Sequence, residues 1–292
     1  MSITNKITVI IVLYNSSEII FDCLKTLNNF EIIIVDNGKN SMVLKKLGSM
    51  KNIKIVSPGK NIGMGRGANF AFPYVKSDFF LLLSPDIQID EDSILKLINT
   101  ISKNENCAIA APLNITDPDS YGILPEKREL YEKNRDRIHF KKEKLNLKPE
   151  GEICVDVTKG CALLIKSKYY KEVGGFSEKY FLFWEEIDLC KKFLKKNLSI
   201  IVNPLSIAYH KEGTSAKVNL ESLFIRSFHH ELSPLYYFNV KKNSLRIYAN
   251  MLKYLFRTLS YFFILNLKKS VKNFSKLSAN IVYLLKWKIR LP

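Results

Sequence analysis

Three carboxylates crowd the stretch FLFWEEIDLCKK (residues 181–192), where Glu185 and Glu186 are adjacent and Asp188 follows two positions later. A carboxylate beside bulky apolar side chains can have a raised pKa, and such a group can act as the general base for a reacting hydroxyl. Acidic residues in the first turn of a helix also stabilise the positive end of its dipole without any chemistry. Taken alone, the stretch leaves an acid/base site and a simple helix start about equally open.

Other polar residues of chemical interest follow apolar runs. Asp36 ends the run EIIIVD, where its carboxylate could accept hydrogen bonds from a nucleobase or ribose, or could belong to a D-N-G turn. Asp86 follows the run FFLLL and could hold a divalent cation, although a Ser-Pro-Asp turn also explains it. His210 follows a later apolar run; a lone histidine is more often structural, but this one could be a nitrogen ligand of the same cation.

The segment GKNIGMGRGANF (residues 59–70) carries four glycines. Glycines at the start of a helix let backbone N–H groups approach a diphosphate, so we predict nucleotide contacts at Gly63 and Arg66. The turn after the first apolar run, YNSSE, has no glycine, and the chain has no P-loop lysine pattern. Binding of a nicotinamide dinucleotide or ATP is therefore disfavoured.

The elements that must position these residues alternate in the first half of the chain. Near-continuous runs of Ile, Val and Leu, separated by helix-like segments, are typical of strands buried on both faces of a parallel α/β sheet. Ligands of such sheets bind at the carboxyl ends of the strands. The residues directly after the predicted strands are Tyr14, Asn15, Asp36, Ser84 and Asp86.

The composition sets the class of protein. With 292 residues, 47% of them hydrophobic, the chain can bury one large core. The five cysteines are odd in number and include no C-x-x-C pair, so we expect neither a disulfide framework nor a thiolate zinc site. The N-terminal apolar run lacks a cleavage site and is interpreted as a first strand, so we expect a cytoplasmic protein.

The C-terminal part of the chain is basic and amphipathic. The net charge is +17, and after Glu231 no acidic residue occurs while twelve Lys and Arg residues alternate with aromatic and aliphatic ones. This pattern suits an anionic bilayer surface, and the longest uncharged apolar segment, residues 258–267, is too short to span a membrane. A face packed on the catalytic domain and a nucleic-acid-binding surface are the alternatives. We predict membrane association and no nucleic-acid partner, with a catalytic domain over residues 1–225 and a membrane-associating region over residues 226–292.

The order of these features resembles the inverting family 2 glycosyltransferases with the GT-A fold, and within them the rhamnosyltransferase-like branch of bacterial cell-surface polysaccharide synthesis. The matching pieces are VIIVLYN, IIIVDN, KNIGMGRGANFA, LLLSPD, GCALLIKSKYYKEVGGFSEKYFLFWEEIDLC, AYH with GTSA, and HHELSPLYYFNVKK. Each piece is weak alone, but seven in the same order over residues 7–242 are specific. The resemblance implies a GT-A-like, Rossmann-type α/β fold with a mostly parallel sheet, followed here by basic amphipathic helices.

The resemblance also implies roles for residues on the donor side. Asp36 matches the nucleotide-binding aspartate of the family, and Asn61 and Gly63 lie in the segment near the nucleotide. Asp86 matches the metal-binding last position of a D-x-D-like motif, and His210 matches the metal histidine. A divalent cation, Mg²⁺ or Mn²⁺, is the expected cofactor.

On the acceptor side, the acidic stretch matches a motif usually written Glu-Asp-x-Asp, whose second acid is the general base. That position is Glu186, one methylene longer than the usual aspartate, and Asp188 is the second candidate. Ser84 stands where the family has asparagine or aspartate. Phe183 and Trp184 could stack on sugar faces and raise the pKa of the base.

The predicted function is transfer of rhamnose or another hexose from a dTDP- or UDP-sugar to a lipid-linked saccharide, in O-antigen, capsule or cell-wall polysaccharide synthesis. The enzyme is expected on the inner face of the cell membrane as a peripheral protein. A nucleotidyltransferase that makes nucleotide sugars and a non-enzymatic nucleic-acid-binding protein are the alternatives.

Overall fold

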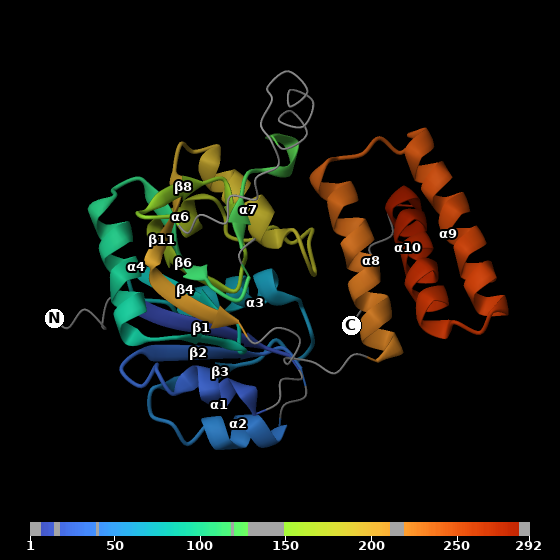
Figure 1. The fold of residues 1–292 in the computed structure, drawn as a ribbon. Coiled ribbons are helices and arrows are strands. Elements are labelled where there is room, and N and C mark those ends of the chain that lie inside the picture. Colours follow the sequence, from blue (N-terminus) through green and yellow to red (C-terminus); the bar gives the residue numbers. More distant parts are fainter. Residues whose placement is uncertain are drawn as a thin grey trace.

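The computed structural model describes residues 7–14, 18–38, 41–117, 120–127, 149–210 and 219–285. An α/β body holds the first part of the chain, and three long helices at the C-terminal end lie beside it (Figure 1).

The body is built on a nine-stranded sheet with the order β3-β2-β1-β4-β10-β6-β11-β5, and β8 pairs with β11. Six strands, β3, β2, β1, β4, β6 and β11, run in one direction, while β10, β5 and β8 run against them. The predicted mostly parallel sheet is therefore confirmed. The strands are β1 (Ile7–Leu13), β2 (Glu31–Asp36), β3 (Ile53–Val56), β4 (Phe79–Leu83), β5 (Ile87–Ile89), β6 (Cys107–Asn114), β8 (Ile153–Val155), β10 (Ala162–Lys166) and β11 (Ser199–His210), with a separate pair β7 (Tyr121–Gly122) and β9 (Val157–Thr158).

Helices cover both faces of the sheet, which explains the continuous apolar runs. Along β1, Val9 and Ile11 enter one hydrophobic core and Ile10 enters the other. Because both faces are buried, alternate polar residues would lie in a core without partners. The helices of the body are α1 (Ile19–Leu24), α2 (Ser41–Leu47), α3 (Met64–Ala71), α4 (Glu91–Lys103), α6 (Ser167–Glu172) and α7 (Glu185–Leu194), with a 3₁₀ turn at Phe72–Tyr74.

The C-terminal part consists of α8 (Leu220–Tyr237), α9 (Leu245–Phe263) and α10 (Leu267–Leu285). Their shared core includes Phe228 of α8, Ile247 of α9 and Ala279 of α10. In Figure 1, α8 is the helix nearest the body and α9 lies on the outer side. The boundary at residue 225 stays a prediction, and α8 runs through it. No helix in the described part of the chain is both long and apolar enough to cross a membrane.

Candidate active site

The ends of β1, β2 and β4 meet at one edge of the sheet. Leu13 pairs with Asp36 across the first two strands, and the chain leaves β4 at Ser84 on the same edge. Tyr14 follows β1 and is partly exposed, whereas Asn15 lies outside the described residues. The Asp36 carboxylate also accepts from the Gly38 amide at 3.3 Å, so the predicted turn is present beside the predicted nucleotide contact.

Asn37, treated in the sequence only as a turn residue, organises the glycine-rich segment. Its side chain is buried, donates to the Asn61 Oδ1 atom at 2.9 Å and to the Gly63 carbonyl at 3.2 Å, and accepts from the Ile62 amide at 2.8 Å. The segment is thereby tied to the carboxyl end of β2. The sequence signal for this role was an asparagine directly after a buried strand, but the hydrogen-bond partners of that asparagine lie about 25 positions away in the chain.

The glycines themselves have a packing role that the sequence did not indicate. Gly63 has φ of 85°, and an added Cβ would lie 2.1 Å from the Phe181 carbonyl oxygen. A Cβ on Gly65 would lie 2.9 Å from the Phe176 ring, and one on Gly67 would meet Val12 at 2.8 Å. These glycines let α3 fit between β1 and the segment before α7. Contact with a diphosphate remains a prediction for them.

Two other predicted nucleotide contacts have partners within the protein. The Arg66 guanidinium donates to the Glu178 carbonyl, so this side chain reaches toward the segment before α7. The Ser84 amide donates to the Cys161 carbonyl at 2.9 Å, which ties the end of β4 to the start of β10. Their role in binding a nucleotide sugar stays a prediction.

The structure brings Asp86 and His210 together. His210, the last residue of β11, pairs with Ile87, the first residue of β5, so Asp86 lies next to it. The His210 Nε2 atom is 3.3 Å from Asp86 Oδ1, and Asp86 is only 5% exposed. The short strand β5, which begins at Ile87, was not anticipated from SPDIQID, where the sequence indicated a turn.

This pair fits a divalent cation shared with a diphosphate. A carboxylate oxygen and an imidazole nitrogen suit Mn²⁺ and are compatible with Mg²⁺, both of which also take phosphate oxygens as ligands. Across the described ranges, no cluster of three or more His, Cys, Asp or Glu residues could hold a metal by itself. Asp86 and His210 would therefore hold the ion together with the substrate.

The acidic stretch forms the start of α7, and the chain enters it in a strained conformation. Phe183 and Trp184 have φ of 65° and 70°, values that cost non-glycine residues about 1–3 kcal/mol each. Contacts with α8 hold them there: the Trp184 ring lies 5.0 Å from that of Tyr237, and the Phe183 ring lies 5.8 Å from that of His230. Sequence reasoning missed this role of α8. Stacking of Phe183 and Trp184 on a sugar stays a prediction.

Glu185 is buried and Glu186 is half-buried in the first turn of α7. The Oε2 atoms of both have no hydrogen-bond partner in the described part of the chain, although buried polar atoms normally have one. Burial raises the pKa of both carboxyls, and the charge of Glu186 raises the pKa of Glu185 further. The neighbouring Lys159 ammonium acts in the opposite direction on the pKa of Glu186. Of the two carboxyls, Glu186 is the one on which the Lys159 charge acts.

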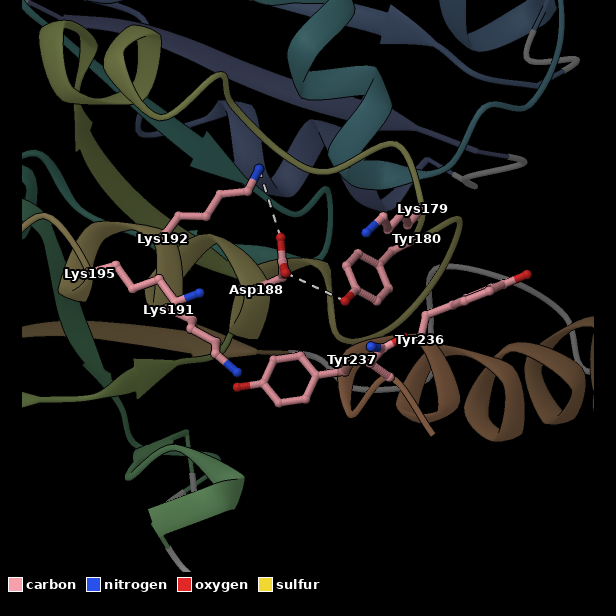
Figure 2. Close-up of a pocket in the computed structure, with 9 residues that line it drawn as sticks. Lys179, Tyr180, Asp188, Lys191, Lys192, Lys195, Tyr236 and Tyr237 are labelled. Atoms are coloured by element: carbon pink, nitrogen blue, oxygen red, sulfur yellow. Dashed lines mark hydrogen bonds and ion pairs between the residues drawn. The ribbon is translucent and has the colours of Figure 1, made fainter. Parts of the chain in front are cut away.

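Asp188 lies on a different side of α7. Two positions along a helix correspond to about 200°, so its side chain points away from that of Glu186. Its Oδ1 atom accepts from the Tyr180 hydroxyl at 3.4 Å, and its Oδ2 atom is 3.8 Å from the Lys192 ammonium (Figure 2). This arrangement favours Glu186 over Asp188 as the base.

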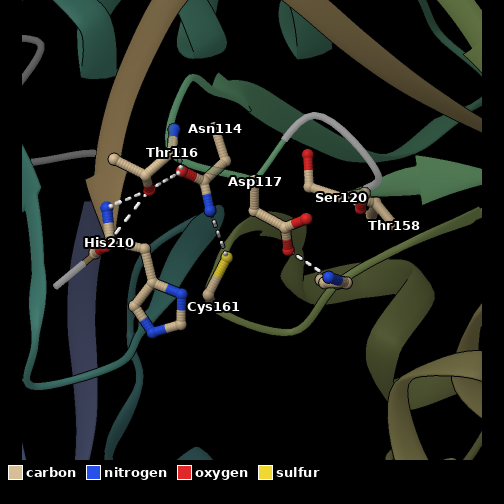
Figure 3. A network of polar contacts seen from close by, with 8 residues as sticks. Asn114, Thr116, Asp117, Ser120, Thr158, Cys161 and His210 are labelled. Carbon is tan, nitrogen blue, oxygen red and sulfur yellow. Dashed lines mark hydrogen bonds and ion pairs between the residues drawn. The ribbon is translucent and has the colours of Figure 1, made fainter. Parts of the chain in front are cut away.

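A polar network joins the backbone of His210 to the end of β6 (Figure 3). The Thr116 hydroxyl bonds to the backbone of His210 and donates to Asn114 Oδ1 at 2.7 Å. Asp117, the next residue, forms an ion pair with Lys159, the cation close to Glu186. Sequence reasoning missed both members of this ion pair: Asp117 lies in a charged segment without clear periodicity, and Lys159 ends the predicted strand VDVTKG. Residues 114–117 thus link His210 to Lys159.

Comparison with known proteins shows the family of this chain. The family model described as "Glycosyl transferase family 2" matches residues 8–172. A low-salt glycan biosynthesis hexosyltransferase of Haloferax volcanii is 26% identical over 209 residues, which cover 67% of this chain and 64% of that protein. An N-acetylglucosaminyl-diphospho-decaprenol L-rhamnosyltransferase of Mycobacterium tuberculosis is 24% identical over 223 residues, covering 66% of this chain and 71% of that protein.

A solved structure shares the fold. The mannosyltransferase of Pyrobaculum calidifontis, in complex with GDP-Man and Mn²⁺, superposes with a TM-score of 0.56 at 13% identity, covering 96% of this chain and 74% of that one. The matched family model covers more than half of the sequence, and the predicted GT-A-like fold is found. The chain belongs to glycosyl transferase family 2, in its rhamnosyltransferase-like branch.

Proposed function

We propose that this glycosyltransferase moves rhamnose or another hexose, with inversion, from a dTDP- or UDP-sugar to a lipid-linked saccharide of a cell-surface polysaccharide. One arrangement carries the proposal: His210, which lies beside Asp86, is bonded to Thr116, the next residue Asp117 pairs with Lys159, and the Lys159 charge acts on Glu186. A donor diphosphate needs the Asp86–His210 pair, and an acceptor hydroxyl needs Glu186.

On the donor side, Asp36 would accept hydrogen bonds from the nucleoside at the end of β2. Asp86 and His210 would hold Mg²⁺ or Mn²⁺, which neutralises the charge that gathers on the leaving diphosphate. The relatives support this reading, since the mannosyltransferase neighbour was solved with a nucleotide sugar and Mn²⁺.

On the acceptor side, Glu186 would accept the proton of the attacking hydroxyl. The hydroxyl oxygen forms its bond to the anomeric carbon from one face while the bond to the diphosphate breaks on the other, so the configuration inverts. Glu186 needs to be ionised for this step, and Lys159 favours its ionised form. Burial and the Glu186 charge both raise the pKa of the Glu185 carboxyl.

The C-terminal helices would bring the enzyme to the inner face of the cell membrane. One face of α9 packs inward through Ile247 and Tyr254, and the other exposes an apolar stripe. The stripe consists of Leu245, Tyr248, Leu252, Leu255, Phe256, Leu259, Phe262 and Phe263. Lysines and arginines of α9 and α10 carry no acidic neighbours within these helices, so apolar insertion and attraction to anionic lipids act together.

The test is a screen of nucleotide sugars with the full chain and Mn²⁺, measuring release of the nucleoside diphosphate. We expect release from a dTDP- or UDP-hexose, accelerated by a lipid-linked saccharide, and a product with inverted anomeric configuration. Formation of a nucleotide sugar from a nucleoside triphosphate and a sugar phosphate, without any sugar transfer, would contradict the proposal.

A further inference from the structure

A second pocket lies on the side of α7 away from Glu186. Its cavity of about 330 Å³ lies between α7 and the C-terminal end of α8 (Figure 2). Asp188 and three lysines of α7 form one wall, at positions spaced by three and four residues and therefore on one helix face. The lining residues are Lys179, Tyr180, Asp188, Lys191, Lys192, Lys195, Tyr236, Tyr237 and Asn239.

The charges in this pocket are not balanced. Lys191 pairs with Glu126 at 2.7 Å, and Lys192 has Asp188 at 3.8 Å. Lys179 and Lys195 are exposed, and neither forms an ion pair with a carboxylate in the described part of the chain. Four ammonium groups and two carboxylates leave an excess of two positive charges around the cavity.

One of the four cations, Lys192, is half-buried. Burial lowers the pKa of the Lys192 ammonium, Asp188 raises it, and the nearby Lys179 charge lowers it again. The cations therefore repel one another across the pocket, and a bound anion would relieve that repulsion. The last carbonyls of α8 do not oppose an anion strongly, since the Asn239 and Val240 amides already donate to them.

We propose that this pocket binds the diphosphate that links the acceptor saccharide to its lipid. A diphosphate esterified at both ends carries two negative charges, which match the excess, and the Tyr236 and Tyr237 rings give it apolar flanks. The assignment rests on the proposed function. The pocket includes Asp188 of the first turn of α7, and the same turn carries Glu186 on its other side, so the acceptor would bind around this turn.

The pocket is tested by calorimetry with inorganic pyrophosphate and with geranyl diphosphate, in excess chelator so that no cation bridges them to Asp86. Replacing both Lys179→Gln and Lys195→Gln should weaken binding of either probe about 30-fold or more, since charge-assisted hydrogen bonds are lost. Lys196→Gln, an exposed lysine beside the pocket, is the matched control and should change binding less than twofold.

Three outcomes would overturn the proposal. One is equal binding of pyrophosphate by the double variant and the wild-type chain. Another is displacement of pyrophosphate by a nucleoside diphosphate in chelator, which would assign the anion to the donor. Geranyl diphosphate should bind at least about tenfold more tightly than inorganic phosphate; equal affinity would mean a site for free phosphate.

These results are separable from the proposed function. Release of nucleoside diphosphate from the donor, measured without acceptor, should be the same for the double variant and the wild-type chain. If that release is absent in both while pyrophosphate still binds, the proposed function fails and the anion pocket stands. If release persists and pyrophosphate does not bind, only the pocket assignment fails.

Discussion

The outer face of α9 offers a substitution that should detach the protein from membranes without unfolding it. Leu252, Phe256 and Phe263 are 70%, 73% and 78% exposed and lie on one stripe of the helix. Changing all three to serine removes apolar surface that is already in water, so the free energy of unfolding should change little.

The size of the effect follows from the exposed area. Burying a whole Leu or Phe side chain contributes about 1.5–3 kcal/mol, so the exposed parts of these three contribute about 5 kcal/mol when fully buried. If half of that area enters the interface, the triple variant loses about 2.5 kcal/mol, or roughly 60-fold in partitioning. The lysines and arginines remain in the triple variant, and their contribution to membrane binding should weaken as salt rises.

The assay is sedimentation with vesicles of phosphatidylcholine and phosphatidylglycerol, with Met42→Ser as the matched control. Met42 is 82% exposed but belongs to α2 of the body, far along the chain from α9. We expect the control to sediment as the wild-type chain does and the triple variant to stay in the supernatant while still releasing nucleoside diphosphate. Equal sedimentation of all three proteins would refute the membrane role of α9.

Three further predictions concern the body. Asp86→Ala, or excess chelator, should abolish nucleoside diphosphate release because the leaving group loses its cation; full activity in chelator would contradict this. Burial raises the pKa of Glu185 in the folded state, which means that the fold favours the protonated carboxyl. The contribution of this protonated carboxyl to the free energy of unfolding is full below the unfolded pKa of about 4.5 and is lost as pH rises. Glu185→Gln should therefore raise the melting temperature at pH 8 more than at pH 5, and an equal shift at both would disprove the burial effect. Gly63→Ala should lower the free energy of unfolding by about 3 kcal/mol, because the added Cβ would overlap the Phe181 carbonyl. Gly59→Ala is the control: Gly59 has φ of 76° and open space around it, so the loss should be only about 1 kcal/mol. Similar losses for the two variants in denaturant melts would count against the close approach of Gly63 to Phe181.

The sheet and its binding edge were predictable because both follow from local patterns. Apolar runs broken by helix-like segments indicate strands buried on both faces, and the polar residues after them must share an edge. Asp86 and His210 were each placed after an apolar run, and the structure brings their side chains to 3.3 Å. The start of α7 was also readable from its acidic first turn.

The contacts that complete the site were not predictable, since each joins segments far apart in the chain. Gly63 meets Phe181 more than a hundred positions away, and Asp117 meets Lys159 across a charged segment without periodicity. The aromatic residues before α7 pointed to sugar stacking, but their contacts with α8 appear only when the helices are packed, as for Trp184 against Tyr237.

The choice between Glu186 and Asp188 bears most directly on the central claim that Glu186 is the base of an inverting transfer. Glu186→Gln keeps the shape of the side chain but cannot accept a proton, so turnover should fall about 100-fold or more while donor binding survives. Asp188→Asn should leave turnover within about tenfold, because Asp188 faces Tyr180 and Lys192 instead of the region near Lys159.

The measurement is single-turnover transfer by the two variants and the wild-type chain, with donor affinity measured in parallel. The account predicts a large loss for Glu186→Gln alone. A silent Glu186→Gln together with a 100-fold loss for Asp188→Asn would contradict it and move the base to the other side of α7.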